Sequence, residues 1–461
     1  MADDGAAGAL ATFAATCAAG ELPAEARRVH KALIIDAVAC AAAAWVTAVP
    51  ARELLVAAAH LAPGLTPGPG FLVSGRGAPA VAASVNGALI HTLVWDAAGA
   101  PGAHLGMVGF APALAAAEAL GRPVSGATLL AATAAACEVH ARLVRVARRG
   151  SRSGEDGWLD GQLLGCFGAC AGAGRVLGLT PVEMESAFGL SLMQASGSRE
   201  VIRGGEPPVK ALYGGPGNLA GVLAAYLAAS GVDGRCDALH GPAGMLRGWF
   251  GCEETAALDA ELGSDFQGAD VHFKEWPSSG AVQPYIHVAR RLRAMAGYDA
   301  AAISAVRLVA PREEHRWVLP LEERLAPRDA AVACNSIPFG LACALLTGEV
   351  TLGNLSAEGL RRADVAALLG RFEVSFVEER LTARVEVETD AGALLSTPVF
   401  TAETDNFGTL PPEQVAEKLA SCNAAHPRPM PDAAVARICE LVWRLEELDD
   451  VAELVALLVG S

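Results

Sequence analysis

Two histidines and one carboxylate lie close together in the stretch "HTLVWDAAGAPGAH", which runs from His91 to His104 with Asp96 between them. The stretch begins as an apolar run and then turns into Ala, Gly and Pro, which is the composition of a loop. Imidazole and carboxylate groups are the side chains that most often take up and return protons in enzymes. The stretch is therefore either a loop for acid–base catalysis or a connector that carries polar residues.

Two further polar patches stand in apolar surroundings. In "EPPVKALYGGPGN", Lys210 and Tyr213 are three residues apart and share a face if the segment is helical. The glycines that follow would let the backbone approach a ligand closely. In "HFKEWPSSGAVQPYIH", His272 and Lys274 precede a proline, two serines and a glycine. Taken singly, such patches are more typical of a lysine whose stem packs on apolar surface, or of a histidine satisfied in the core.

The elements that must position these residues are mostly helices. Alanine, the best helix former, makes up much of the 52% hydrophobic content, whereas aromatic residues make up 5%. Apolar residues at three- and four-residue spacing predict two or three helices in the first 60 residues, followed by helices at 80–95, 111–120, 126–147, 161–177, 181–195 and 217–230. Thr180 and Pro181 are a favourable cap and first-turn pair for one of them.

The pattern changes near residue 265. Apolar and polar residues alternate with the strand period in "AISAVRLVAP", "RFEVSFVEE" and "ARVEVETDAG", and a helix is predicted at 337–347 between them. Helical patterns return after about residue 405, over 411–425 and 435–460. We therefore predict a mainly α protein with a large helical domain (1–266), an α+β insert (267–404) and C-terminal helices (405–461) that return to the first domain.

Composition argues against several classes of function. A formal net charge of −16 is unsuited to nucleic acid or to an anionic membrane surface. The eleven cysteines lack metal-site spacing and indicate buried, reduced thiols, so no metal is expected. The segment "GRGAPA" matches a dinucleotide fingerprint, but its surroundings are helical rather than βαβ. An acidic N-terminal stretch and apolar runs too short to span a bilayer predict a cytoplasmic protein.

The three patches, in this order, resemble the MmgE/PrpD family, which includes 2-methylcitrate dehydratase, cis-aconitate decarboxylase and iminodisuccinate epimerase. The segment "NGALIHTLVWD" is similar to the family's Asn-Gly-x-x-x-His-x-x-Asp-Phe-Asp-Asp, and "GWLDGQLLGCFG" aligns with Gly-Phe-His-Pro-Thr-Gly-Thr-Phe-Gly. The resemblance covers nearly the whole chain. It implies a large helical domain with a smaller α+β lid, a homodimer, no cofactor, and small carboxylate substrates that exchange a proton beside a carboxylate.

The resemblance also marks individual positions. His104 falls on the family's loop histidine, Asp96 on the second Asp of its segment and Lys210 on a family lysine, while Tyr213 stands where the family has a His. We take these four as the catalytic candidates. The positions that the resemblance places around a substrate are Lys274, His91, Val94, Leu159, Ser278, Ser279, Gln283 and Phe339.

Several positions depart from the family pattern. Val94 stands in place of an Asp, Leu159 and Gln283 each replace a His, and residues 278–280 replace Cys-Cys-Arg. Each positioned acid or base contributes roughly 10²–10⁴-fold in rate, so the ordinary dehydration of 2-methylcitrate is not expected. Val94, Leu159 and Phe339 would make the pocket more apolar and suit a larger, less charged substrate.

Three functions follow as alternatives. The first is a repurposed lyase or isomerase in which His104 and Lys210 exchange protons, while Tyr213 and Lys274 bind or polarise an oxyanion or carboxylate. The second is a cyclase or rearrangement catalyst of specialised metabolism that holds a bulky substrate in a reactive shape. The third is a catalytically silent homologue that binds a ligand or a partner chain.

Overall fold

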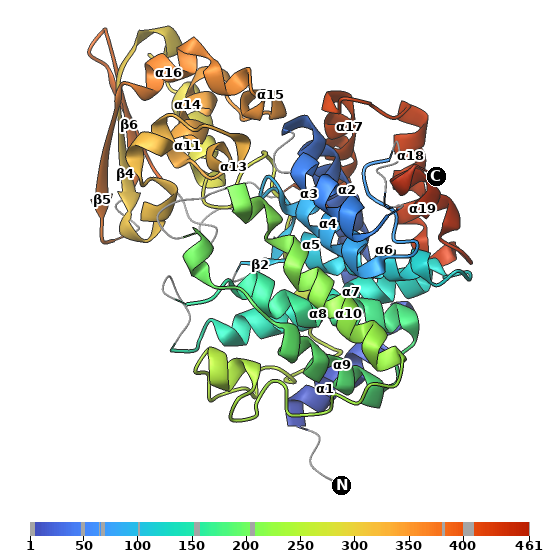
Figure 1. Ribbon diagram of the computed structural model, residues 1–461. Helices are drawn as coiled ribbons and strands as arrows, with labels where there is room; N and C mark the ends of the chain where they lie inside the picture. The colour runs from blue at the N-terminus through green and yellow to red at the C-terminus, as the bar shows by residue number, and fades with distance from the viewer. Residues whose placement is uncertain are drawn as a thin grey trace.

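A computed structural model of the protein describes residues 5–47, 51–63, 65, 70–99, 102–151, 157–202, 208–379, 383–399 and 410–460. A large helical domain and a smaller domain with a sheet lie side by side (Figure 1). The mainly α fold expected from the alanine-rich composition is thereby confirmed. We keep the name lid for the smaller domain.

Two long helices form the centre of the helical domain. They are α2 (Ala24–Thr47) and α7 (Gly126–Ala147), and both are long and apolar enough to cross a membrane by composition alone. In this fold, however, 83% and 89% of their most apolar windows are buried inside the protein. Their apolar character is therefore accounted for by the core. The helix α8 (Asp160–Leu177) packs against α7, and α10 (Gly214–Ala229) packs against α8.

Local sequence signals place several helix ends where they were predicted. The helix α9 (Pro181–Gln194) begins at a capping box in which Thr180 and Glu183 bond each other's backbone N–H groups. The helix predicted over 80–95 is shorter than expected: α4 (Pro79–His91) ends at His91. It ends there because Val94 adopts a left-handed backbone conformation, with φ at 53°, that cannot continue a right-handed helix.

The lid is built on a four-stranded sheet. Its strands are β4 (Ile303–Pro311), β5 (Phe372–Val377), β6 (Arg384–Thr389) and β7 (Leu394–Pro398), in the order β5-β4-β6-β7. Only the β4–β5 pair is parallel. The helices α11 (Gln283–Arg293), α14 (Ile337–Thr347) and α16 (Ala363–Leu369) lie together on one side of the sheet (Figure 1). The strand patterns predicted three of these strands, and β7 was missed.

The C-terminal helices pack on the helical domain beside α2 (Figure 1). They are α17 (Val415–Ala425), α18 (Asp432–Trp443) and α19 (Ala452–Val459), so the continuous helix predicted over 435–460 is broken around residues 444–451. The predicted boundary at 404/405 lies outside the described residues. Residues 267–272, just after the boundary predicted at 266/267, pack against α7 and the helical domain.

A short three-stranded sheet contains part of the histidine stretch. It consists of β2 (Ala103–His104), β1 (Ala98–Gly99) and β3 (Val271–His272), paired antiparallel in that order. The remaining helices are α1 (Gly5–Thr16), α3 (Ala51–Leu61), α5 (Leu105–Gly109), α6 (Ala111–Ala119), α12 (Leu321–Leu325), α13 (Ala330–Ala333) and α15 (Leu352–Leu355).

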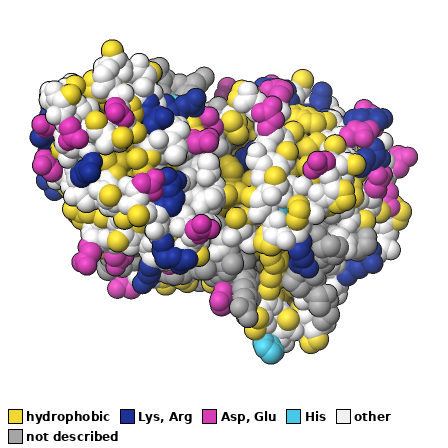
Figure 2. Space-filling model, turned by 90° about the horizontal axis from the view of Figure 1, so that it is seen from above, with side chains coloured by type: hydrophobic (Ala, Val, Ile, Leu, Met, Phe, Trp, Pro, Cys, Tyr) yellow, Lys and Arg dark blue, Asp and Glu magenta, His cyan; other side chains and the backbone are white. Residues whose placement is uncertain are grey.

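The distribution of charged side chains on the surface and the burial of the cysteines agree with the composition. On the face in Figure 2, Lys and Arg side chains are interspersed with Asp and Glu over both domains. All eleven cysteines lie within the described residues, where no disulfide joins them, and nine of them are buried. The apolar surroundings raise the pKa of these buried thiols, for example that of Cys17 to about 12.

Candidate active site

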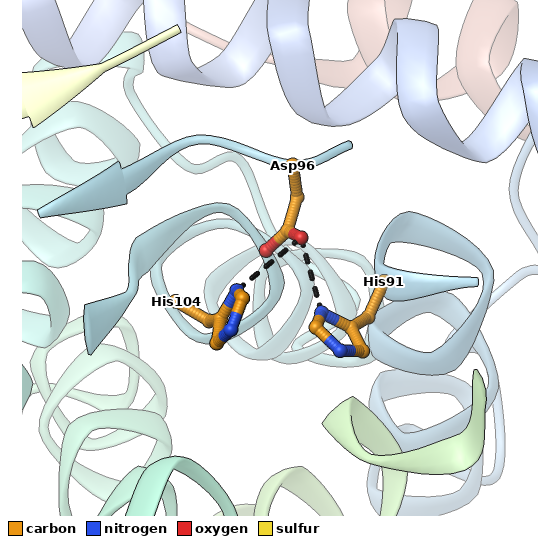
Figure 3. Close-up of side chains that lie close together, drawn as sticks. All are labelled: His91, Asp96 and His104. Atoms are coloured by element: carbon orange, nitrogen blue, oxygen red, sulfur yellow. Dashed lines mark hydrogen bonds and ion pairs between the residues drawn. The ribbon is translucent and has the colours of Figure 1, made fainter. Parts of the chain in front are cut away.

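The stretch from His91 to His104, called the histidine loop from here on, gathers its two histidines and its one carboxylate into one cluster (Figure 3). His91 Nδ1 donates a hydrogen bond of 3.0 Å to Asp96 Oδ1, and His104 Nδ1 lies 3.5 Å from the same oxygen. The two imidazole rings meet edge to face with centroids 4.5 Å apart. His91 and Asp96 are fully buried, whereas the His104 side chain is 20% exposed. The loop therefore presents one imidazole of the cluster outward.

Three elements hold the cluster in place. His91 is the last residue of α4, and His104 ends β2 immediately before α5 begins. Asp96 lies between them and packs against the start of α5, where a Cβ on Gly106 would come within 3.1 Å of the Asp96 Cβ. A side chain at residue 106 would push Asp96 away from the imidazoles, so the glycine permits the close approach.

Burial and proximity determine the protonation of the cluster. Burial works against ionisation of Asp96, but the two imidazoles hold the pKa of its carboxyl well below the ordinary value. Burial lowers the pKa of His104 to about 3, against the opposing attraction of the Asp96 carboxylate. At neutral pH, Asp96 is therefore a carboxylate that faces a neutral His104 imidazole, whose Nδ1 is directed toward it. A proton on Nδ1 leaves the Nε2 lone pair of His104 available as a base.

The same three residues offer a ligand set for a metal ion. One ligand atom from each lies within 4.8 Å of the others, and two imidazoles with one carboxylate suit zinc or non-haem iron. A metal-binding histidine normally donates its second ring N–H to a neighbour. The His91 Nε2 atom has no hydrogen-bond partner among the described residues, and the Lys274 ammonium acts on the same cluster electrostatically. The surroundings therefore fit proton transfer better than a dication.

Tyr213 covers the two imidazoles. Its ring centroid lies 5.1 Å from that of His91 and 5.9 Å from that of His104. Its hydroxyl donates to Asp160 Oδ1 (3.3 Å) and accepts from the Gly161 N–H (2.8 Å). Burial raises the pKa of this phenol above its ordinary range, so it stays protonated. The structure places Tyr213 in the cluster, and its predicted role in proton transfer stays a prediction.

Tyr213 also lines a cavity of about 360 Å³. Its walls are mostly apolar and include Leu159, Val201 and Val209. Lys210 is the one charged side chain among the described residues that line it, and its Nζ donates to Asn335 Oδ1 of the lid (3.3 Å). Of the predicted residues, Leu159, Lys210 and Tyr213 thus meet at one cavity.

Lys274 lies inside the protein rather than at the cavity. Its Nζ donates to the carbonyl oxygens of Val94 (2.6 Å) and Asp96 (2.8 Å), and its side chain is buried. Burial lowers the pKa of Lys274, and the Asp96 carboxylate opposes that effect. Val94 is likewise buried, with its carbonyl held by Lys274. The predicted substrate contacts of these two residues stay predictions.

The four lid residues predicted to surround a substrate are buried within the lid. Gln283 Nε2 donates to Ser278 Oγ (2.6 Å) and to the Trp276 carbonyl (2.8 Å). The Ser279 N–H donates to the Cys334 carbonyl, and Phe339 is buried in α14. None of the four lines the cavity described above. The structure therefore connects the lid to Lys210 through Asn335 instead, and the substrate contacts of the four stay predictions.

Sequence reasoning missed four residues of the site. Asp160 holds Tyr213 and pairs with Arg148 at 2.8 Å, and Asn335 holds Lys210. Asp36 and Lys418 form an ion pair below the histidine loop. Asp36 did give a signal, because a single carboxylate inside the apolar run "LIIDAVACAAAA" requires a buried partner.

Comparisons with known proteins match almost the whole chain to one family. Family models of the MmgE/PrpD N-terminal and C-terminal domains match residues 8–257 and 276–430. The chain is 27% identical to a cis-aconitate decarboxylase of Homo sapiens over 413 residues, which cover 83% of this chain and 80% of that protein. It is also 27% identical to a cis-aconitate decarboxylase of Aspergillus terreus, over 97% of this chain and 94% of that protein.

Proposed function

The chain belongs to the MmgE/PrpD family, and we propose that it is a cofactor-independent lyase or isomerase that moves a proton beside a carboxylate or carbonyl group of a small substrate. An enzyme of the lyase type agrees with its relatives, which are cis-aconitate decarboxylases. The reaction and the substrate are the parts that we infer from the site.

The pairing of Asp96 with His104 carries this proposal. A neutral imidazole that places Nδ1 toward a buried carboxylate has the orientation of a general base, and the carboxylate stabilises the imidazolium that forms. The low pKa of His104 keeps its imidazole neutral at pH 7, which is the form that can accept a proton. His104 Nε2 takes a proton from the carbon beside the carboxylate or carbonyl group, and the C–H electron pair is delocalised into that group. In an isomerase the imidazolium returns the proton to a carbon of the delocalised system. In a lyase the pair forms a C=C bond while the bond to the leaving group breaks, and the imidazolium protonates that group.

The cavity supports a substrate with little charge. A carboxylate seated there would find Lys210 as its cation, while Leu159, Val201 and Val209 would contact an apolar body. Cis-aconitate carries three carboxylates, and one lysine would leave two of them without a cation from the cavity wall. We therefore propose a mono- or dicarboxylate with an apolar part.

A substrate panel tests this function. The purified protein is incubated in D₂O with monocarboxylates, dicarboxylates and cis-aconitate, and deuterium incorporation, loss of a leaving group and CO₂ release are followed by NMR. We expect turnover of a mono- or dicarboxylate with deuterium entering beside the carboxylate. CO₂ release from cis-aconitate as the fastest reaction would overturn the inferred substrate class. No turnover and no thermal shift with any compound would overturn the proposed catalysis and favour the silent homologue.

A further inference from the structure

The backbone of the histidine loop next to Asp96 is held by charged side chains from distant parts of the chain. Lys418 Nζ, from α17, donates to the carbonyl of Trp95 (3.0 Å). Asp36 Oδ2, from α2, accepts the N–H of Ala97 (2.9 Å). These two bonds grip the residues immediately before and after Asp96, so they fix the direction in which its side chain leaves the backbone.

Lys418 and Asp36 also bind each other. Lys418 Nζ lies 2.6 Å from Asp36 Oδ1, the two side chains are 1% and 0% exposed, and 382 residues separate them in sequence. The Lys418 Nζ also lies 4.2 Å from the centroid of the Trp95 ring. The ion pair thus joins α2, α17 and the histidine loop at one point. Every charged atom that takes part in it is engaged with the loop or with its partner.

A buried ion pair is a poor way to gain stability. Well-packed apolar side chains of similar size usually serve folding as well or better, because both charges must leave water. The pair does, however, supply directional bonds that an apolar contact lacks. Such bonds matter at Trp95 and Ala97, because the neighbouring Val94 is a β-branched residue in the left-handed region, a conformation that persists only where the surroundings impose it.

We propose that Asp36 and Lys418 are positioning residues that keep the Asp96 carboxylate aimed at His104. The proposal rests on the proposed role of Asp96 and His104 in proton transfer. It assigns to the C-terminal helix α17 a part in the active site, although α17 lies more than 300 residues beyond the histidine loop in sequence.

The test replaces both charges together, as Asp36→Asn with Lys418→Met. This double variant leaves no unpaired buried charge and keeps an oxygen for the Ala97 N–H, so it is the variant best suited to fold. The matched control is Lys31→Met with Glu446→Gln. Lys31 and Glu446 form an ion pair at 2.5 Å between α2 and the C-terminal region, and Lys31 also bonds the Trp443 carbonyl rather than the histidine loop.

On the substrate found in the panel, we expect kcat of the double variant to fall about 10–100-fold with KM nearly unchanged, because a displacement of about 1 Å in a catalytic group costs this much. The control should keep the wild-type kcat. Amide hydrogen exchange at residues 95–97 should accelerate in the double variant and stay slow in the control. Wild-type kcat with wild-type exchange in the double variant would overturn the proposal.

Misfolding of the double variant and failure of the proposed function can each be distinguished from failure of the positioning role. If the double variant fails to fold, Asp36→Asn alone takes its place with the same readouts, and wild-type kcat and exchange in that variant would contradict the proposal. If the wild-type protein turns over no carboxylate, the proposed function fails. The exchange rates would still decide whether the ion pair holds the loop, and unchanged exchange in the double variant would then reject the positioning role.

Discussion

The histidine loop is buried and bonded to charged side chains, whereas the wall of the neighbouring cavity consists of short, partly exposed turns. We define the cavity wall as residues 196–202 and 208–213. Loop residues 91–97 are buried and bonded to Lys274, Lys418 and Asp36. The cavity wall consists largely of short 3₁₀ turns, and its Val201 and Val209 are 51% and 45% exposed. The loop that we propose to move the proton is thus held by buried charges, whereas the wall that we propose to contact a substrate consists of short, partly exposed turns.

Asp96→Asn should produce the largest effect. An asparagine keeps the size of the side chain but removes the charge that orients His104 and stabilises its imidazolium, so kcat should fall by about 10²-fold or more. The stability of the fold should change much less than the activity. Steady-state kinetics and thermal unfolding measure the two. A variant with more than half of the wild-type kcat would break the assignment of Asp96 to the reaction.

Substitution of the two lysines matched to the family should affect stability differently, because Lys274 holds the histidine loop and Lys210 lies in the cavity wall. Lys274→Met leaves two buried carbonyls without a donor and should lower the free energy of unfolding by about 2 kcal/mol. Lys210→Met, its control, lies at the half-buried wall and should cost less than about 1 kcal/mol while raising KM for a carboxylate. Denaturant titration gives both free energies. Equal losses of stability in the two variants would contradict the comparison.

Acid should lower the free energy of unfolding through the protonation of His104. The pKa of His104 is about 3 in the folded protein and 6.5 ordinarily, so the unfolded chain binds the proton first as pH falls. The free energy of unfolding should therefore decrease between pH 6.5 and 3, with His104 contributing up to about 1 kcal/mol per pH unit. Denaturant titrations at pH 7.5 and pH 5 measure this slope. His104→Gln should flatten it, and an unchanged slope in that variant would be inconsistent with a buried neutral imidazole.

Val201→Ala should have the smallest effect on stability. An exposed side chain in a 3₁₀ turn contributes little, so the free energy of unfolding should change by less than about 0.5 kcal/mol. KM for an apolar carboxylate should nevertheless rise several-fold, because Val201 lines the cavity. The control Val182→Ala, at an exposed position on α9, should leave both unchanged. An unaltered KM in Val201→Ala would contradict the proposal that the cavity wall contacts the substrate.

The sequence predicted what depends on local pattern. Alanine spacing and the Thr180–Pro181 pair located the helices, and alternation located three of the four lid strands. The proximity of His91, Asp96 and His104 was also foreseeable, because they share one short stretch. The pairing of Asp36 with Lys418 was not, since it joins residues 382 apart and depends on how α17 packs on α2. The end of α4 at His91 was not foreseeable either, because the left-handed conformation of Val94 is accompanied by a tertiary bond from Lys274 to the Val94 carbonyl.

The most direct test of the account is the exchange of a substrate proton with solvent in His104→Gln. With the substrate identified in the panel, the wild-type protein should incorporate deuterium from D₂O at the carbon beside the carboxylate. The His104→Gln variant should do so at least about 100-fold more slowly while melting at the wild-type temperature in the presence and absence of that substrate. Incorporation at the wild-type rate in His104→Gln would contradict the central claim that this imidazole carries the proton.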